Sequence, residues 1–177
     1  MLRQLHKLGI RNTVMMTGDS YRTAEAIARQ VGVDQFFAEV LPEDKANFVQ
    51  KAKAEGRTVV MIGDGINDSP ALSAADIGIA INSGAAIARE IADVTIKADS
   101  LEELVTLKTI ANALQHRVSS NYRFVLSFNS TLIALGALGI LQPAASAMLH
   151  NLSTIGISLR SMTNLIQKPS SAPQLEG

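Results

Sequence analysis

The stretch that decides the fold is Met61-Ile-Gly-Asp-Gly-Ile-Asn-Asp-Ser-Pro-Ala-Leu72. It overlaps the run Thr58–Ile62, which is apolar, rich in β-branched residues and bounded by glycines, and this pattern predicts a buried strand. Gly63 and Gly65 then permit a tight turn that larger side chains would obstruct. The stretch therefore predicts a strand, a turn at the C-terminal edge of a sheet, and the start of a helix.

Two carboxylates and an amide lie in this turn. Asp64 comes directly after the strand, and open α/β sheets bind ligands at the edge where it would lie. A carboxylate there suits Mg²⁺, which prefers oxygen ligands and keeps several waters while it contacts phosphate. Asp68 lies four residues further on and can support the site without contacting the ion directly, and Asn67 can hydrogen-bond nearby. The turn is therefore predicted to bind magnesium.

Strand and helix patterns alternate on both sides of this turn, which predicts an α/β fold with a parallel sheet covered on both faces. An amphipathic helix is also predicted within Met1–Gly9, and no signal peptide is visible there. The other predicted strands are Thr13–Met16, Phe36–Val40, Ile77–Ile81 and Val94–Ile96, and the helices are Ser20–Val31, Pro42–Ala54, Ser69–Ala75 and Gly84–Ile91.

Two more motifs precede the central turn. Thr17-Gly18-Asp19 ends the first strand, where a hydroxyl and the N–H groups of a helix start can hold phosphate oxygens. A plain helix cap by Asp19 is the alternative. Lys45 lies in the first turn of the helix that starts at Pro42, a place that disfavours cations and thus indicates an anionic partner. The alternative is a solvated lysine.

The residues after Asp99 have a different character. Leu101–Tyr122 reads as one long helix, residues 124–141 carry no charge, and Gln142-Pro143 breaks the pattern before a second apolar segment. A bilayer crossing takes about 20 mainly apolar residues, so we expect a two-helix transmembrane hairpin. Cationic residues flank it on both sides, which predicts that both ends and the soluble part are cytoplasmic. Two core helices of a soluble protein are the alternative.

These patterns predict four parts and exclude several kinds of function. The parts are 1–100 (partial α/β domain), 101–123 (connecting helix), 124–166 (transmembrane hairpin) and 167–177 (disordered tail). Lys and Arg balance Asp and Glu at 16 each, and aromatic residues make up 4%, so we expect no nucleic acid partner. The absence of cysteine excludes disulfides and thiolate metal sites.

Taken in order, Thr17-Gly18-Asp19, Pro42-x-x-Lys45 and Gly63-Asp-Gly-Ile-Asn-Asp-Ser-Pro70 resemble three signatures of the P-type ATPase phosphorylation domain. This domain belongs to the haloacid-dehalogenase-like superfamily, so the resemblance implies a partial HAD-like, Rossmann-type sheet. It also implies that Thr17 binds the transferred phosphoryl group and that Lys45 neutralises its charge. Asp64 and Asp68 would hold Mg²⁺, and ATP would be the substrate of the intact pump.

The sequence departs from the family in one respect. The family's nucleophile lies in an Asp-Lys-Thr-Gly motif on the central strand, and this string does not occur here. We therefore expect a fragment, inactive alone, whose partner is the missing N-terminal part of the same pump. A membrane-tethered phosphatase of the superfamily and a non-catalytic membrane remnant are the alternatives.

Three segments carry a closer resemblance: Asp76-Ile-Gly-Ile-Ala-Ile81, Asn121-Tyr122 and Phe128-Asn129. They resemble the corresponding segments of heavy-metal pumps (class IB). The resemblance implies a transition-metal cargo, with Zn, Mn, Co, Fe and Cu all open. Polar groups at membrane depth usually face a bundle interior or an ion path, although hydrogen bonding between helices is the alternative. The candidates for contact with the transported ion are Asn129, His150, Asn151, Ser153 and Thr154.

Overall fold

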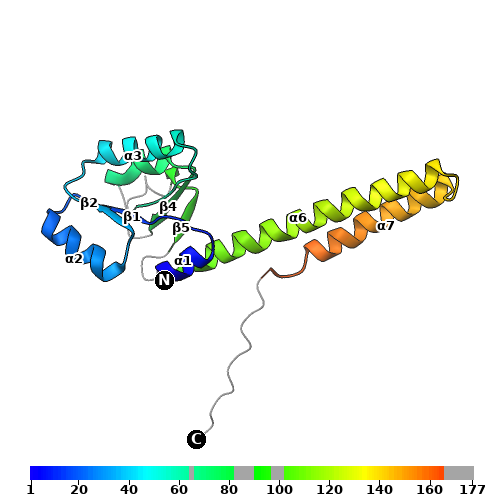
Figure 1. Ribbon diagram of the computed structural model, residues 1–177, viewed down its shortest axis with the longest axis horizontal. Helices are drawn as coiled ribbons and strands as arrows, with labels where there is room; N and C mark the ends of the chain where they lie inside the picture. The colour runs from blue at the N-terminus through cyan, green and yellow to red at the C-terminus, as the bar shows by residue number, and fades with distance from the viewer. Residues whose placement is uncertain (64–65, 82–89, 97–101, 166–177) are drawn as a thin grey trace, which may run out of the picture. The chain divides into compact units, whose positions relative to one another are not determined.

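The computed structural model describes residues 1–63, 66–81, 90–96 and 102–165 (Figure 1). The predictions for Asp64, Gly65, most of the helix over 84–91 and the tail 167–177 lie outside these residues. The chain divides into two compact units, Met1–Leu107 and Lys108–Gly177, and each is described by itself.

The first unit alternates strands and helices, as the sequence predicted. The elements are α1 (Leu2–Lys7), β1 (Val14–Met16), α2 (Tyr21–Val31), β2 (Gln35–Phe37), α3 (Pro42–Ala54), β3 (Val60–Gly63), the short 3-10 helix η1 (Ile66–Asp68), α4 (Ser69–Ala74), β4 (Ile77–Ile81) and β5 (Val94–Ile96). The strand predicted over Phe36–Val40 is shorter than expected. It ends at Phe37, because the chain turns at Glu39, whose φ is +55°.

All strand pairs are parallel, but they form two sheets. One contains β1 and β2, and the other has the order β3-β4-β5. The expectation of one sheet is therefore corrected: among the described residues, β1 and β3 each have a ladder partner on one side only. β2 and β5 are likewise paired on one side only, so four strand edges are open among these residues, and each is a site where a further strand can pair.

Helices cover the two faces of the larger sheet (Figure 1), and an apolar cluster lies on each face. One joins α3 and α4 to β3, and the other joins α1 and the first turns of α6 to β4 and β5. The buried members are Val49, Met61, Ala71 and Leu72 in the first cluster, and Leu5, Ile79, Ile96 and Leu104 in the second. The layers thus follow the predicted arrangement of helices on both faces.

An aspartate fixes the start of each strand pair. In every case the carboxylate accepts a hydrogen bond of 2.7–2.8 Å from a backbone N–H on the neighbouring strand, and the aspartate's own N–H donates to the carbonyl of that same residue. Such a two-way bond sets the register at the point where the strands meet. The pairs are Asp34 with Thr13, Asp76 with Val59, and Asp93 with Gly78.

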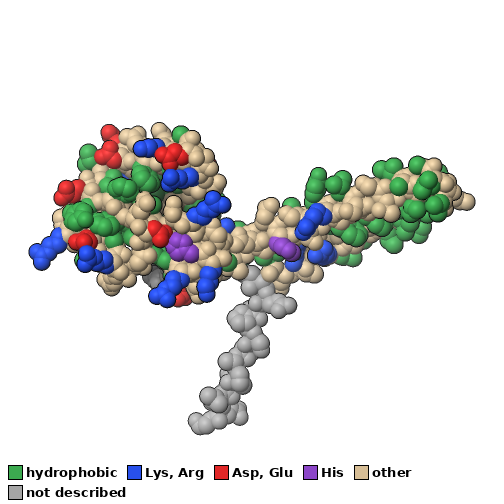
Figure 2. Space-filling model, viewed as in Figure 1, with side chains coloured by type: hydrophobic (Ala, Val, Ile, Leu, Met, Phe, Trp, Pro, Cys, Tyr) green, Lys and Arg blue, Asp and Glu red, His purple; other side chains and the backbone are tan. Residues whose placement is uncertain are grey.

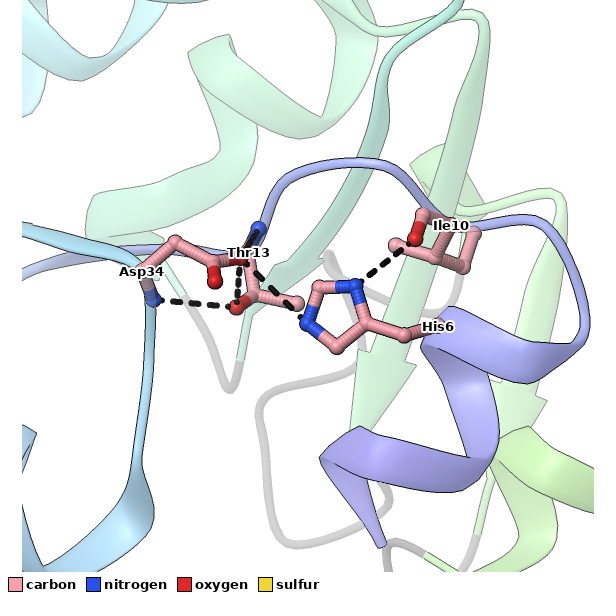
Figure 3. Close-up of polar contacts among 4 residues, drawn as sticks. All are labelled: His6, Ile10, Thr13 and Asp34. Carbon is pink, nitrogen blue, oxygen red and sulfur yellow. Dashed lines mark hydrogen bonds and ion pairs between the residues drawn. The ribbon is translucent and has the colours of Figure 1, made fainter.

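The first of these pairs also reaches α1 (Figure 3). The hydroxyl of Thr13 donates to Asp34 at 2.8 Å, and Nε2 of His6 lies 3.4 Å from the same carboxylate oxygen. Nδ1 of His6 lies 2.9 Å from the carbonyl oxygen of Ile10, to which it donates. His6 therefore connects the end of α1 to the start of the β1–β2 pair.

These bonds predict a loss of stability in acid. The Thr13 hydroxyl lowers the pKa of Asp34, and the backbone N–H of Val59 lowers the pKa of Asp76. A lowered pKa in the folded state stabilises the fold above the unfolded value of about 3.9, and the contribution is lost as pH falls through the folded pKa. Between pH 7 and pH 3, the urea midpoint of the wild type should thus fall further than that of Asp34→Asn/Asp76→Asn. An equal fall would contradict this.

The second unit is a helical hairpin. Helix α6 (Glu102–Ala137) continues without a break past residue 123, the predicted end of the connecting helix. Helix α7 (Pro143–Ser161) starts at the predicted break, with Gln142 as its N-cap. Gly139 adopts φ +70°, the left-handed conformation that commonly ends a helix. The apolar residues 138–141 consequently belong to the turn.

The transmembrane prediction for 124–166 is corrected. Among the described residues, no helix combines the length and the apolar character that a membrane crossing requires. The reason is visible in each helix: α6 ends at Ala137 and contains Arg123 and Asn129, while α7 contains His150 and Asn151. Apolar side chains nevertheless gather toward the turn of the hairpin (Figure 2), where Ile133 is 73% exposed.

Polar contacts join the two helices at the opposite end of the hairpin. The guanidinium of Arg117 donates to the carbonyl oxygens of Ser161, Thr163 and Asn164, and Nδ2 of Asn121 donates to the hydroxyl of Ser161 at 3.0 Å. Carbonyls at a helix C-terminus lack partners within the helix, so a cation that binds them is favourable. Arg117 thus caps the C-terminus of α7.

Candidate functional site

The three sequence motifs come together around one apolar cluster. Met16, which ends β1 just before Thr17, packs against the cluster that contains Met61 of β3 and Val49 of α3. Lys45 lies one helical turn before Val49 on the same helix. The C-terminal ends of β1 and β3 and the first turn of α3 therefore meet at the edge where parallel sheets bind ligands.

Lys45 and Asp68 form a direct ion pair at this edge. Nζ of Lys45 donates to Oδ1 of Asp68 at 2.8 Å, and the two side chains are only 14% and 11% exposed. Buried charges need a partner because removal from water costs more than an isolated charge can recover. The pair therefore holds the lysine ammonium in place beside the turn after β3.

Gly63 is required by the close approach of Asp68. A Cβ atom at position 63 would lie 2.6 Å from Cβ and 2.9 Å from Oδ2 of Asp68, closer than such atoms approach in proteins. The absence of a side chain at Gly63 thus allows Asp68 to lie against the end of β3. The sequence had indicated that a glycine was needed here, and the structure gives the contact that requires it.

Thr17, Gly18 and Asp19 form a compact turn after β1. The hydroxyl of Thr17 donates to Oδ2 of Asp19 at 2.8 Å, and the N–H of Asp19 donates back to that hydroxyl at 3.2 Å. Ser20, not Asp19, is the N-cap of α2, so the helix-cap alternative does not describe Asp19. Asp19 instead holds the Thr17 hydroxyl in a defined position.

The donor chemistry at the turn after β3 fits Mg²⁺ in part. Asp68 offers a buried carboxylate, Asn67 is exposed beside it, and carboxylate and amide oxygens are ligands that Mg²⁺ accepts. Within the described residues, no three acidic or histidine side chains gather as a metal site, and Asp64 and Gly65 lie outside them. Asp68 has one oxygen engaged by Lys45, which leaves Oδ2 for another partner.

Two of the candidates for contact with the transported ion are brought together. Nδ1 of His150 on α7 lies 2.9 Å from Oδ1 of Asn129 on α6, although 21 residues separate them. The hydroxyls of Ser153 and Thr154 donate to the carbonyl oxygen of His150 within α7, and Asn151 is exposed. The structure therefore brings His150 together with Asn129, while the hydroxyls of Ser153 and Thr154 are bonded to the backbone of their own helix.

Sequence reasoning missed two contacts. It gave Lys45 and Asp68 separate partners, whereas they bind each other across 23 residues. It counted the cationic residues before the hairpin, which include Arg117, only as flanking charges, whereas the guanidinium of Arg117 caps α7. No spacing rule connects residues so far apart. The only available signal for Lys45 was its unfavourable place in the first turn of a helix.

Comparison with known proteins agrees with this geometry. Residues 1–76 match the haloacid dehalogenase-like hydrolase family. Over 157 residues, the chain is 40% identical to a manganese-exporting P-type ATPase of Mycobacterium leprae, and the match covers 88% of this chain and 22% of the relative. A probable copper-importing P-type ATPase A of Enterococcus hirae is 40% identical over 164 residues, which is 92% of this chain and 22% of the relative.

A solved structure is similar over nearly the same length. The chain superimposes on a zinc-transporting PIB-type ATPase in its E2.Pi state with a TM-score of 0.82 and 33% sequence identity, covering 90% of this chain and 26% of that one. The chain thus spans about a fifth of the length of the curated relatives that it matches.

Proposed function

This chain belongs to the PIB-type heavy-metal P-type ATPases and corresponds to the C-terminal part of such a pump, and from that premise we propose a role for each of its two units. The first unit supplies the phosphate and Mg²⁺ site of an ATP-driven transporter. The second supplies part of the path of a transition-metal cation. The complete protein moves this cation across a lipid bilayer.

The observation that carries the proposal is the buried Lys45–Asp68 pair at the end of β3. Phosphoryl transfer is catalysed mainly by positioning and charge neutralisation, so an ammonium fixed at this edge has a direct use. In this proposal, Lys45 faces the phosphoryl oxygens, and the Thr17 hydroxyl exchanges its bond to Asp19 for a bond to one of them. Asp68 and Asp64 hold Mg²⁺, which neutralises charge on the same oxygens when bound.

The group that becomes phosphorylated comes from outside this chain. No Asp-Lys-Thr-Gly string occurs in the sequence. The open edges of β1 and β3 offer room for the strand that carries it in the complete protein. ATP hydrolysis is accordingly a property of the complete pump, and the separate chain should not form a phosphoenzyme.

The Asn129–His150 pair is the proposed contact with the transported cation. An amide oxygen can only accept, so Nδ1 of His150 must donate to Asn129, and this leaves the lone pair of Nε2 for a metal. A hydrogen bond at the other ring nitrogen commonly fixes the tautomer of a metal-binding histidine. Neutral imidazole binds several transition metals, so the Asn129–His150 pair does not select one of them.

A chimaeric pump tests the proposed function. We would replace the matching part of the Mycobacterium leprae relative with this chain and measure ATP hydrolysis stimulated by Mn²⁺, Zn²⁺ or Cu⁺. At least one metal should stimulate hydrolysis. Lys45→Ala should reduce the rate by a factor on the order of 100 or more, since loss of a preorganised charge contact costs about that much. A chimaera that no metal stimulates, or that tolerates Lys45→Ala, would overturn the proposal.

The role of His150 has a separate readout in the same chimaera. His150→Ala should raise the metal concentration for half-maximal stimulation by roughly 10-fold or more, and Asn129→Leu should have a smaller effect in the same direction. Ser158→Ala is the matched control, because the Ser158 hydroxyl donates to the backbone carbonyl of Thr154 in the same helix. Equal responses to His150→Ala and Ser158→Ala would exclude the histidine from the ion path.

A further inference from the structure

A small cavity lies beside the Thr17–Asp19 turn. Its volume is about 270 Å³, and its walls come from the ends of β1 and β2, the loop after β2 and the first two turns of α3. The apolar part consists of Met16, Phe37, Val40 and Phe48, with the two phenyl rings 5.2 Å apart in a tilted arrangement. Phe37 is 41% exposed, so an aromatic face is accessible from solvent.

The rim of this cavity is acidic. Glu39 and Asp44 line it, both are exposed, and neither forms an ion pair with a described residue. Asp44 lies in the first turn of α3, where a carboxylate is favourable for the helix itself. The carboxylate of Glu39 has no comparable role in a helix, because Glu39 lies in the loop between β2 and α3. Glu39 adopts φ +55°, a conformation that costs energy for a residue with a side chain.

The loop that carries Glu39 is bound to the phosphate-site turn. The N–H of Glu39 donates to the carbonyl of Asp19 at 2.9 Å, the N–H of Val40 donates to Thr17 at 3.0 Å, and the N–H of Thr17 donates to Phe37 at 3.0 Å. Three backbone bonds therefore connect the rim of the cavity to the Thr17–Asp19 turn. Any group that binds the rim also acts on the turn proposed to hold phosphate.

We propose that this cavity binds an arginine side chain presented by a protein segment. The aliphatic stem would lie against the apolar wall and the guanidinium over the phenyl rings, as arginine does on aromatic faces. Glu39 and Asp44 would neutralise its charge. The cavity is smaller than the roughly 300–1,000 Å³ of most ligand sites, and this size suits one long side chain.

Other occupants fit the same surface less well. A purely apolar group would desolvate two carboxylates without pairing them, which is unfavourable. A divalent cation prefers an oxygen-rich site, whereas this wall is mostly phenyl and aliphatic, and the described residues contain no cluster of three metal-binding side chains. A guanidinium with an aliphatic stem satisfies both the charge and the apolar wall.

The test is a titration of the full chain followed by amide NMR. The probe is Nα-acetyl-arginine methylamide, and the control probe is the citrulline analogue, which has nearly the same shape but no charge. Arginine should shift the amides of Phe37–Val40 and, through the three backbone bonds, those of Thr17–Asp19. A dissociation constant on the order of 10 mM is expected for a single side chain. Citrulline should cause much smaller shifts.

Matched variants test whether the rim carboxylates of Glu39 and Asp44 account for the binding of arginine. Glu39→Gln/Asp44→Asn should weaken binding by about fivefold or more, because two rim ion pairs are lost. Glu43→Gln is the control, since Glu43 is an exposed acidic residue in the same first turn of α3 but does not line the cavity. Phe48→Leu is a second variant, which keeps an apolar wall while it removes an aromatic face. It should also weaken binding.

Three outcomes would overturn the inference. These are equal shifts with arginine and citrulline, unchanged binding in Glu39→Gln/Asp44→Asn, and Mn²⁺ broadening at Glu39 and Asp44, which would identify a metal site instead. The inference does not rest on metal transport. Failure here, with metal-stimulated hydrolysis intact in the chimaera, would leave the proposed function standing.

Discussion

Replacing Lys45 with alanine should lower the free energy of unfolding by about 3–5 kcal/mol, because the buried Asp68 carboxylate would lose its partner. The two side chains are 14% and 11% exposed, so water can replace little of the lost contact. Urea unfolding of the wild type and the variant at pH 7 measures the difference.

Lys53 provides the matched control for this prediction. It lies on the same helix and pairs with Asp76 at 3.2 Å, but both side chains are 36% exposed. An exposed pair of this kind contributes about 0–1 kcal/mol, so Lys53→Ala should lose far less stability. Equal losses in the two variants would show that burial of the Lys45–Asp68 pair does not determine its contribution.

A second variant separates the cost of an unpaired charge from the value of the pair. Lys45→Met/Asp68→Asn removes both charges and keeps similar side-chain volumes. Replacement of a whole buried pair by neutral groups is often close to neutral in stability. The double variant should therefore recover most of the stability that Lys45→Ala loses, although it should not support hydrolysis in the chimaera. Failure to recover stability would indicate that the pair itself is strongly favourable.

Gly63→Ala should lower the free energy of unfolding by about 1–3 kcal/mol, the usual cost of forcing extra atoms into a filled space. The new Cβ would come within 2.6 Å of Cβ of Asp68, so Asp68 or the end of β3 must move. Either movement disturbs the bond to Lys45. Gly18→Ala is the stability control, because its Cβ would meet only the Val40 carbonyl at an ordinary 3.8 Å.

The combination of Gly63→Ala with Lys45→Ala tests whether both changes act through Asp68. Independent sites give additive losses within about 0.5 kcal/mol, whereas residues with a shared partner do not. The loss in the double variant should be smaller than the sum of the two single losses. Additive losses would contradict the view that Gly63 is needed for the position of Asp68.

Several elements could be predicted closely because local signals define them. Pro42 at the first position of α3 and acidic residues in its first turn gave the bounds Pro42–Ala54, as found. Gly32, with φ +79°, ends α2 at Val31, as the sequence indicated. The strand over Phe36–Val40 was less accurate, because bonds from residues 39 and 40 to the Thr17–Asp19 turn end the strand early.

The hairpin shows where a local pattern was not enough. The uncharged run 124–141 resembled a membrane segment in composition. In the structure, Gly139 ends α6 in the middle of the apolar residues, and the four residues after Ala137 form the turn. Composition alone does not determine where a helix ends, and a membrane crossing depends on the apolar residues within one helix.

By itself the sequence determined the alternation of strands and helices and the position of each motif at a strand end, because periodicity, glycine turns and helix caps act over a few residues. Only the tertiary structure decided that Lys45 binds Asp68, that His150 meets Asn129, and that the strands divide into two sheets. These contacts join residues at least 20 positions apart. They depend on how completed helices and strands pack against one another, which no local pattern encodes.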